Sequence, residues 1–199
     1  MAELTRRTLL GAAAGLGVGI GTGLTVPATA AAAPGGFPDY RYLGVAFDKS
    51  KLAYNPTGEL IFPCIRGARG RVPDPLAKYY LYYAPHDAPG GICLSYGERL
   101  DRPFTEYPGN PIVSRSWSPH YSVSHVSSPH VLWNEDVAEM WLYFHGENTT
   151  TRLARSKDGI TSTYDKVVLS TSMLPAGTTE ASYARVFRHD LPGRGARYV

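Results

Sequence analysis

Five of the six histidines in this 199-residue chain lie between positions 86 and 145, and histidine is the side chain that most readily exchanges protons and binds metals near neutral pH. They are His86, His120, His125, His130 and His145. Three convergent histidines suit zinc, but the spacing of residues 120, 125 and 130 matches no known metal-ligand motif. We therefore predict no metal site and no cofactor. We expect four of the histidines to donate hydrogen bonds to hydroxyls or a carboxylate instead: His86, His125, His130 and His145.

Carboxylates beside predicted strands form the second group with chemical potential. Glu59 follows the turn-forming residues 55–58 and directly precedes an apolar stretch. Asp87 follows His86, where a carboxylate either holds the tautomer of the imidazole or caps the turn at residues 90–91. Glu180 opens another apolar stretch, after a Pro- and Gly-containing turn. For each carboxylate the alternative is a solvated turn residue, since most acidic side chains are exposed.

The segments that must position these side chains are short, rich in aromatic residues and repeated. One set of predicted strands covers residues 59–65, 78–84, 91–96 and 104–107, and a second covers 128–133, 139–145, 151–156 and 164–169. Leu81 and Leu142 hold the same place in the two sets, 61 residues apart, and a third set begins at residues 180–187. Repeated four-stranded units are typical of β-propeller blades, with a β-sandwich as the alternative. We predict an all-β fold, a β-propeller of four-stranded antiparallel blades that is incomplete, with two blades plus the start of a third.

Three sequence motifs carry a resemblance to a known family. Residues 80–95 read Tyr-Leu-Tyr-Tyr-Ala-Pro-His-Asp-Ala-Pro-Gly-Gly-Ile-Cys-Leu-Ser, residues 101–113 end in Asn-Pro-Ile-Val, and residues 155–160 read Arg-Ser-Lys-Asp-Gly-Ile. The first resembles the opening blade of the five-bladed β-propeller glycoside hydrolases, a family-43-like superfamily. The other two resemble the end of a blade and a blade hairpin with Gly at its positive-φ position. The resemblance covers residues 55–199, which we expect to be the propeller domain after a lead-in of residues 34–54.

The resemblance implies a carbohydrate ligand and a catalytic role for carboxyl groups. In this family three acidic residues lie near the starts of the innermost strands, one in each of the first three blades. Glu180 looks like the general acid. The chain departs from the pattern in the first two units, where Phe62-Pro63 and Ser128-Pro129 stand in place of Asp-Pro. The acids near these positions are Glu59, Asp74 and Asp87.

These roles lead to a hypothesis about activity. We expect hydrolysis of an O-glycosidic bond in a polysaccharide or oligosaccharide, with Glu180 as general acid and Glu59 or Asp87 as its partner. The histidines and Trp117 are expected to contact the sugar, since an indole suits a pyranose face. The alternatives are a carbohydrate-binding propeller without catalysis and a truncated, inactive fragment. The sequence leaves the oligomeric state open.

The first 33 residues have the pattern of an export signal. Arg6-Arg7 precedes Thr8-Leu9-Leu10 and a Gly/Ala-rich apolar run, and small residues of the Ala-x-Ala type follow Pro27. The arginine pair resembles the twin-arginine type. The alternative is a transmembrane anchor over residues 8–26, whose many glycines make it weakly hydrophobic. We expect an extracellular or periplasmic protein without a membrane anchor after cleavage.

Composition sets further bounds. A net charge of +3 with scattered basic residues argues against nucleic acid as a partner. Cys64 and Cys93 fall on predicted strands that are not neighbours, roughly 9–10 Å apart, so we expect two free, buried thiols rather than a disulfide. Removing 33 of 199 residues leaves 166, which is less than three repeats of 61 residues. This length is why we expect an incomplete propeller.

Overall fold

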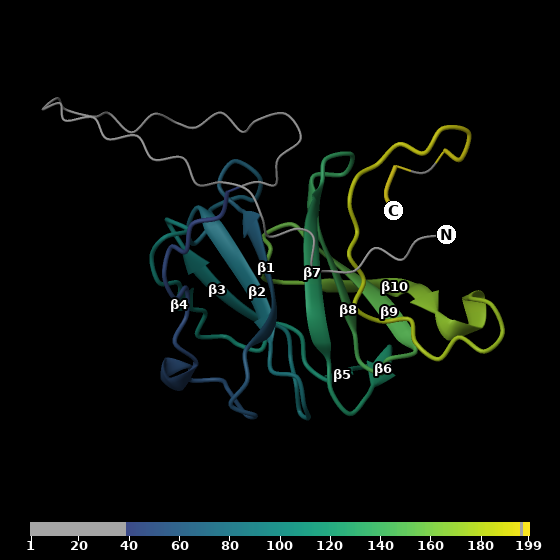
Figure 1. The fold of residues 1–199 in the computed structure, drawn as a ribbon, viewed down its shortest axis with the longest axis horizontal. Coiled ribbons are helices and arrows are strands. Elements are labelled where there is room, and N and C mark those ends of the chain that lie inside the picture. Colours follow the sequence, from purple (N-terminus) through teal and green to yellow (C-terminus); the bar gives the residue numbers. More distant parts are fainter. Residues whose placement is uncertain (1–38, 196) are drawn as a thin grey trace, which may run out of the picture. The chain divides into compact units, whose positions relative to one another are not determined.

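In the computed structural model, which describes residues 39–195 and 197–199, the chain from Tyr42 to Val199 is built from antiparallel β-sheets (Figure 1). The predicted export signal and residues 34–38 of the lead-in lie outside the described residues. Among the residues that are described, no helix is long and apolar enough to cross a membrane.

The first sheet holds four strands in the order in which they occur in the chain. They are β1 (Ile61–Gly67), β2 (Tyr79–Ala84), β3 (Cys93–Gly97) and β4 (Thr105–Glu106), preceded by the short 3-10 helix η1 (Lys49–Lys51). Strand β2 is buried on both faces: Tyr80 and Tyr82 point into one apolar cluster, whereas Leu81 and Tyr83 point into another. This explains its nearly unbroken aromatic sequence, because a strand covered on both faces loses the usual alternation of apolar and polar residues.

The second sheet repeats this arrangement. Its strands β7 (Ser127–Asn134), β8 (Glu139–His145), β9 (Thr150–Ser156) and β10 (Thr163–Ser170) again pair with their neighbours in sequence. A small hairpin precedes it, formed by β5 (Ser116–Trp117) and β6 (Tyr121–Ser122), and the 3-10 helix η2 (Thr171–Met173) follows it. The prediction of an all-β fold with two four-stranded antiparallel sheets is confirmed. The two sheets do not close on each other within the described residues.

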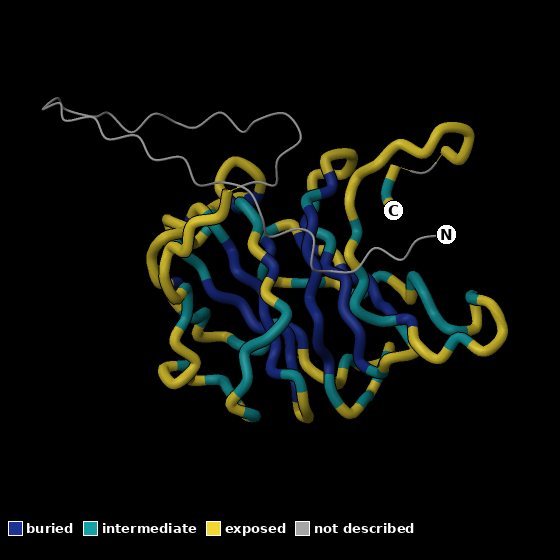
Figure 2. The backbone as a smooth tube through the Cα atoms, viewed as in Figure 1, coloured by how far each residue is buried: buried dark blue, intermediate teal, exposed yellow. Residues whose placement is uncertain are grey.

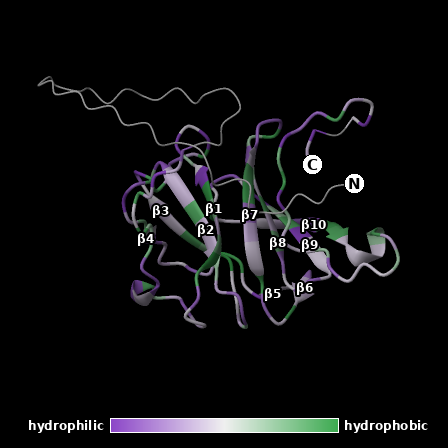
Figure 3. Cartoon of the chain, in the orientation of Figure 1, coloured by the Kyte–Doolittle hydropathy of each residue, from purple (hydrophilic) through white to green (hydrophobic). Residues whose placement is uncertain are grey.

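The main core lies between β1 and β2 of the first sheet and β7 of the second. Figure 2 shows that the buried residues concentrate in the strands of both sheets. Much of β2 is nevertheless pale in the hydropathy colouring of Figure 3, because tyrosine combines a large apolar ring with a polar hydroxyl. The hydroxyl of Tyr82 donates a hydrogen bond of 2.8 Å to the carbonyl of Gly159, which lies between β9 and β10 of the second sheet.

The two cysteines lie on strands that are not neighbours, as their sequence positions predict. Cys64 lies on β1 and Cys93 on β3, with β2 between them, and both thiols are free and buried. The prediction of two free thiols is therefore confirmed.

Asn110, in the motif that resembles the end of a blade, accepts from the backbone N–H of Leu94 at 2.7 Å and donates to its carbonyl at 2.9 Å. The Asn side chain thus pairs with β3 much as a neighbouring strand would.

The third predicted unit is extended but not a regular strand. Residues 180–187 carry no strand assignment, which corrects the predicted strand at this position. Phe187 and Val199 exchange two backbone hydrogen bonds of 2.9 and 3.0 Å, and Arg188 forms an isolated bridge with Tyr198. Ala184, Val186 and Tyr198 pack on the face of the second sheet formed by Leu132, Tyr143 and Leu153. Because this segment pairs with the end of the chain over only a few described residues, no continuous β-ladder of hydrogen bonds forms.

Candidate functional site

Both sheets begin with the same backbone irregularity. In β1 the register passes from Ile61↔Ala84 to Cys64↔Tyr82, and in β7 it passes from Ser127↔His145 to His130↔Tyr143. Each first strand therefore holds one extra residue, a β-bulge, and in both cases a residue with positive φ lies inside it: Phe62 (φ 53) and Ser128 (φ 52). Tyr183 (φ 56) has the same conformation in the third segment. Non-glycine residues seldom adopt this conformation, and such strain concentrates at functional sites.

The bulges determine which end of the sheets carries the candidate residues. Antiparallel pairing puts the start of β1 beside the end of β2, and the start of β7 beside the end of β8. His86 follows β2 by two residues, and His145 is the last residue of β8. Two residues that are far apart in the sequence are therefore brought to the same end of the packed sheets.

Five aromatic side chains meet at this end, and we call them the five-ring cluster: Phe62, His86, His125, His145 and Tyr183. Each ring neighbours two others, with centroid distances of 6.0 Å for Phe62–His86, 6.3 Å for His86–His125 and 5.9 Å for His125–His145. Tyr183 closes the circuit, at 4.8 Å from His145 and 5.2 Å from Phe62. The cluster joins both sheets and the third segment.

His145 is the most buried member of the five-ring cluster. Its side chain is 1% exposed, and neither ring nitrogen has a hydrogen-bond partner among the described residues. Burial, together with the nearby His125 and His86, lowers the pKa of His145 to about 4, although Glu180 and Glu147 act in the opposite direction. The pKa of His125 is also lowered, first by burial and then by His86. Both imidazoles are therefore neutral at pH 7.

Two of the three predicted carboxylates lie on the His86 side of the cluster. One oxygen of Glu59 accepts the backbone N–H of His86 at 3.3 Å, and the carboxylate of Asp87 lies 3.6 Å from the Nδ1 atom of His86. The side-chain donor atoms of Glu59, His86 and Asp87 all fall within 4.8 Å of one another. Glu59 is half-buried and Asp87 is exposed.

Glu180 lies close enough to His145 for its charge to raise the pKa of that imidazole, and it precedes Tyr183 by three residues. Its carboxylate is exposed and accepts a hydrogen bond from the hydroxyl of Ser182. The neighbouring Ala181 is buried, and its backbone N–H donates to the carbonyl of Asn148 at 2.7 Å. The hydroxyl of Thr151 donates to the carbonyl of Ala181, also at 2.7 Å. These two bonds fix the backbone that carries Glu180 to the turn between β8 and β9.

A partly buried ion pair at the same turn had not been predicted from the sequence. Arg152 is 6% exposed, donates to Glu147 at 2.6 Å and stacks over the ring of Tyr121 at 4.9 Å. Burial favours the neutral form of Glu147, but the hydrogen bond and the positive charge of Arg152 outweigh it and lower the pKa of Glu147. The only sequence signal was a Glu two residues after the end of an apolar strand.

Two predicted ligand-binding residues lie elsewhere. His130 is buried on the face of β7 that packs against the third segment, where its Nε2 atom bonds the carbonyl of Val186 at 2.7 Å. Trp117 belongs to a separate aromatic group with Tyr121 and Tyr164, with centroids 6.2 and 5.9 Å from it. His120 joins that group by stacking on Tyr164 at 4.3 Å. The structure therefore brings His86, His125 and His145 together and separates His130 and Trp117 from them.

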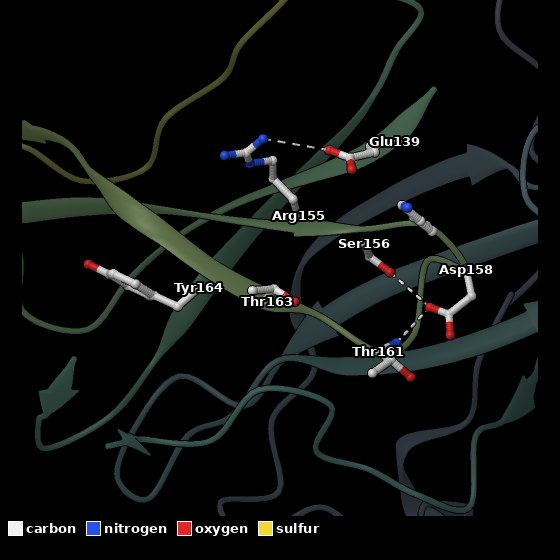
Figure 4. Close-up of a pocket in the computed structure, with 8 residues that line it drawn as sticks. Glu139, Arg155, Ser156, Asp158, Thr161, Thr163 and Tyr164 are labelled. Atoms are coloured by element: carbon white, nitrogen blue, oxygen red, sulfur yellow. Dashed lines mark hydrogen bonds and ion pairs between the residues drawn. The ribbon is translucent and has the colours of Figure 1, made fainter. Parts of the chain in front are cut away.

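A pocket of about 450 Å³ also lies outside the cluster, on β8, β9 and β10 (Figure 4). Arg155 bonds Asp165 at 2.8 Å and approaches Glu139 at 3.9 Å. One carboxylate oxygen of Glu139 has no hydrogen-bond partner among the described residues. Asp158 accepts from Ser156 and from the backbone N–H groups of residues 160 and 161 at 2.7–2.8 Å. These contacts of Asp158 are those of a well-formed hairpin turn.

Comparison of the chain with protein-family models, with curated proteins and with solved structures found no match. The chemistry of the five-ring cluster and its carboxylates is therefore the main indication of function. The cluster offers carboxylates near His86, a further carboxylate whose charge acts on His145, and partly exposed aromatic rings. This combination suits a polar, uncharged ligand with both apolar faces and hydroxyl groups.

Proposed function

We propose that the chain binds a carbohydrate at the five-ring cluster and hydrolyses a glycosidic bond there, with Glu180 as the general acid. Glu59 is the proposed partner carboxylate, and Asp87 orients His86. The supporting observation is that Glu59 and Glu180, although far apart in the sequence, each act on a histidine of the same cluster: Glu59 accepts the backbone N–H of His86, and the charge of Glu180 acts on His145. Glycoside hydrolysis ordinarily requires two carboxyl groups on opposite sides of the scissile bond.

The fold that accompanies this function is a β-propeller, with the two sheets as consecutive blades. Three features support this part of the proposal. The strands of each sheet are in sequential order, each first strand carries the same bulge, and the first strands of the two sheets pack together. The third segment packs on the second sheet as the next blade would, and Tyr183 repeats the conformation of Phe62 and Ser128. The proposal also includes export of the protein through residues 1–33 by the twin-arginine route.

A second candidate function is carbohydrate binding without cleavage. The bulge positions of the two sheets hold Phe62 and Ser128, where the glycoside hydrolases that the chain resembles have aspartates. A phenylalanine or a serine cannot act as the general base or nucleophile of that reaction. Binding alone needs only the aromatic rings and hydrogen-bonding groups of the cluster.

The test compares hydrolysis by the parent chain and by Glu180→Gln on two kinds of aryl glycoside. A dinitrophenol leaving group departs without protonation, whereas a poor leaving group needs the general acid. We expect Glu180→Gln to lose about 100-fold or more in kcat on the poor leaving group and much less on the good one. Glu98→Gln is the control, because Glu98 is exposed and pairs with Arg69 at 2.6 Å. It directly follows β3, at the end of the sheet that holds the start of β2, whereas His86 follows the end of β2.

The outcomes separate the two candidates. Equal losses on both leaving groups would exclude Glu180 as the general acid. If the parent hydrolyses nothing but binds oligosaccharides, and His125→Ala weakens that binding, the non-catalytic function is supported. A parent chain that neither hydrolyses nor binds any sugar in a broad panel would contradict both.

A further inference from the structure

Another pocket lies at the opposite end of β1 and β7 from the five-ring cluster. These two strands pack side by side (Figure 1). The cluster includes Phe62 near the start of β1, whereas this pocket is lined by residues 65–67 at the end of β1 and residues 132–133 near the end of β7. Residues 186–188 of the third segment also line it. Its volume of about 360 Å³ falls within the range of small-molecule binding sites.

The lining of this pocket has an excess of positive charge. It contains three arginines, Arg66, Arg71 and Arg188, and we call it the arginine pocket. The only carboxylate in the lining is that of Glu135, which pairs with Arg188 at 3.0 Å. Arg66 and Arg71 bond backbone carbonyls, and neither forms an ion pair within the part of the chain that the structure describes. Two positive charges at the pocket are therefore not balanced by a carboxylate.

Backbone contacts hold both of these guanidinium groups at the pocket without neutralising them. Arg66 donates from Nε to the carbonyl of Val131 on β7, and from Nη1 to the carbonyl of Ile65 at 3.2 Å. Arg71 donates from Nη1 to the carbonyl of Gly67 at 3.2 Å. A guanidinium group has five N–H donors, so most of the donors of each arginine have no protein partner among the described residues. They remain available to a ligand.

Gly67, the last residue of β1, makes room for Arg71. A Cβ atom at this position would lie 2.8 Å from the Nη1 atom of Arg71, which is too close for a non-bonded contact. Any residue larger than glycine would therefore push this guanidinium group aside. The position of Arg71 thus depends on the absence of a side chain at residue 67.

The rest of the lining is mostly apolar. It is formed by Ile65, Leu132, Trp133, Val186 and Phe187. Two of these side chains are notably exposed for their type, Phe187 at 59% and Ile65 at 39%. An inorganic ion would leave this apolar surface in water, whereas the body of an organic anion would cover it. The lining therefore favours a ligand that has both a charged and an apolar part.

We propose that the arginine pocket binds a small organic anion, with its carboxylate or phosphate group held by Arg66 and Arg71 and its apolar body against Trp133 and Phe187. Guanidinium groups bind carboxylate and phosphate oxygens through paired, charge-assisted hydrogen bonds, so both head groups suit the site. The indole of Trp133 suits a flat apolar body. This site does not depend on the carbohydrate function proposed above, because it shares no residue with the five-ring cluster or its carboxylates.

The experiment titrates the full chain with benzoate, phenyl phosphate, inorganic phosphate and benzyl alcohol, each alone, in a calorimeter. We expect at least one of the two aromatic anions to bind at a single site, about tenfold or more tightly than inorganic phosphate and the uncharged benzyl alcohol. The tighter of the two anions identifies the preferred head group. Its affinity should fall as NaCl is added, because the arginines are partly exposed and salt screens their charge.

Two variants test the role of Arg71. Arg71→Gln should weaken binding of the tighter anion about tenfold or more, because it removes a charge-assisted hydrogen bond from an exposed side chain. Gly67→Ala keeps every charge but displaces the Arg71 guanidinium, so it should weaken binding in the same direction. Arg102→Gln is the matched control. It removes the same charge from an exposed arginine outside the pocket and should leave the affinity unchanged.

Several outcomes would overturn the proposal. It fails if neither aromatic anion binds, or if benzyl alcohol binds as tightly as they do. It also fails if Arg102→Gln loses as much affinity as Arg71→Gln, because the attraction would then be a general effect of surface charge. Equal affinity for inorganic phosphate and phenyl phosphate would exclude the contact with the apolar lining. Unchanged affinity in both Arg71→Gln and Gly67→Ala would exclude Arg71 as a ligand contact.

Discussion

The low pKa of His145 predicts that the protein loses stability in mild acid. The folded-state pKa of about 4 lies below the ordinary histidine value of 6.5, because burial, His125 and His86 disfavour the imidazolium. Between these values the unfolded chain binds a proton that the folded chain does not, so stability falls as the pH is lowered from 6.5 toward 4. At 1.36 kcal/mol per pH unit, the full loss is about 3 kcal/mol, and about 2 kcal/mol is lost by pH 5. Glu180 and Glu147 oppose the shift and are included in the folded-state value.

The assay is urea unfolding in the presence of EDTA at several pH values between 7 and 5, for the parent and for His145→Gln. The variant lacks the titrating group, so the parent should lose about 2 kcal/mol more than His145→Gln over this range. His120→Gln, which removes an exposed histidine, should follow the parent. His125 and His130 also have lowered pKa values and add to the acid sensitivity of both proteins, so only the difference between the curves measures His145.

A difference between parent and His145→Gln that does not change with pH would refute this reasoning. Should the variant not fold, the same question is answered in the parent by NMR titration of the imidazole. A pKa of His145 at or above 6.5 would show that burial does not control its protonation.

Two further predictions concern stability. Gly159→Ala should destabilise the protein by about 2 kcal/mol in urea unfolding, because Gly159 has φ +76° and a Cβ there would lie 2.9 Å from the hydroxyl of Tyr82. Gly177→Ala is the control, since φ is +89° but nothing lies within 4 Å; a loss as large as that of Gly159→Ala would argue against the contact. Arg152→Met should cost about 2 kcal/mol because it leaves Glu147 half-buried without its cation, and Arg152→Met/Glu147→Gln should recover part of the loss. Additive losses in the double variant would show that the pair is not coupled.

The strands and the repeat could be predicted from the sequence because their signals are local. Alternating or continuous apolar and aromatic residues bounded by Gly, Pro and Asp turns mark each strand, and the structure places the strands within a few residues of the expected ranges. The separation of Cys64 and Cys93 followed directly from the strand order. The third unit was predicted less well, because whether residues 180–187 form a strand depends on a partner rather than on their own composition.

The candidate site was predicted in part. Residues at strand ends, such as His86, Glu59 and His145, were identified because the ends of antiparallel neighbours meet. Which face of its strand each side chain occupies could not be predicted without knowing how the strands pair and pack. His130 and Leu132 share the face that packs on the third segment, whereas Val131 between them points into the main core. Glu147 and Arg152 gave no distinctive sequence signal, since their pairing depends on the turn between β8 and β9.

The amino-acid sequence by itself determined that this is an all-β chain of repeated four-stranded sheets, and it located the chemically active residues near strand ends. Only the tertiary structure decided which of them meet. Side chains alternate between the two faces of a strand, so the extra residue at each bulge, Phe62 in β1 and Ser128 in β7, resets which side chains point toward the neighbouring sheet. Those bulges, together with the packing of two sheets and the third segment, assemble the five-ring cluster from residues that no local pattern connects.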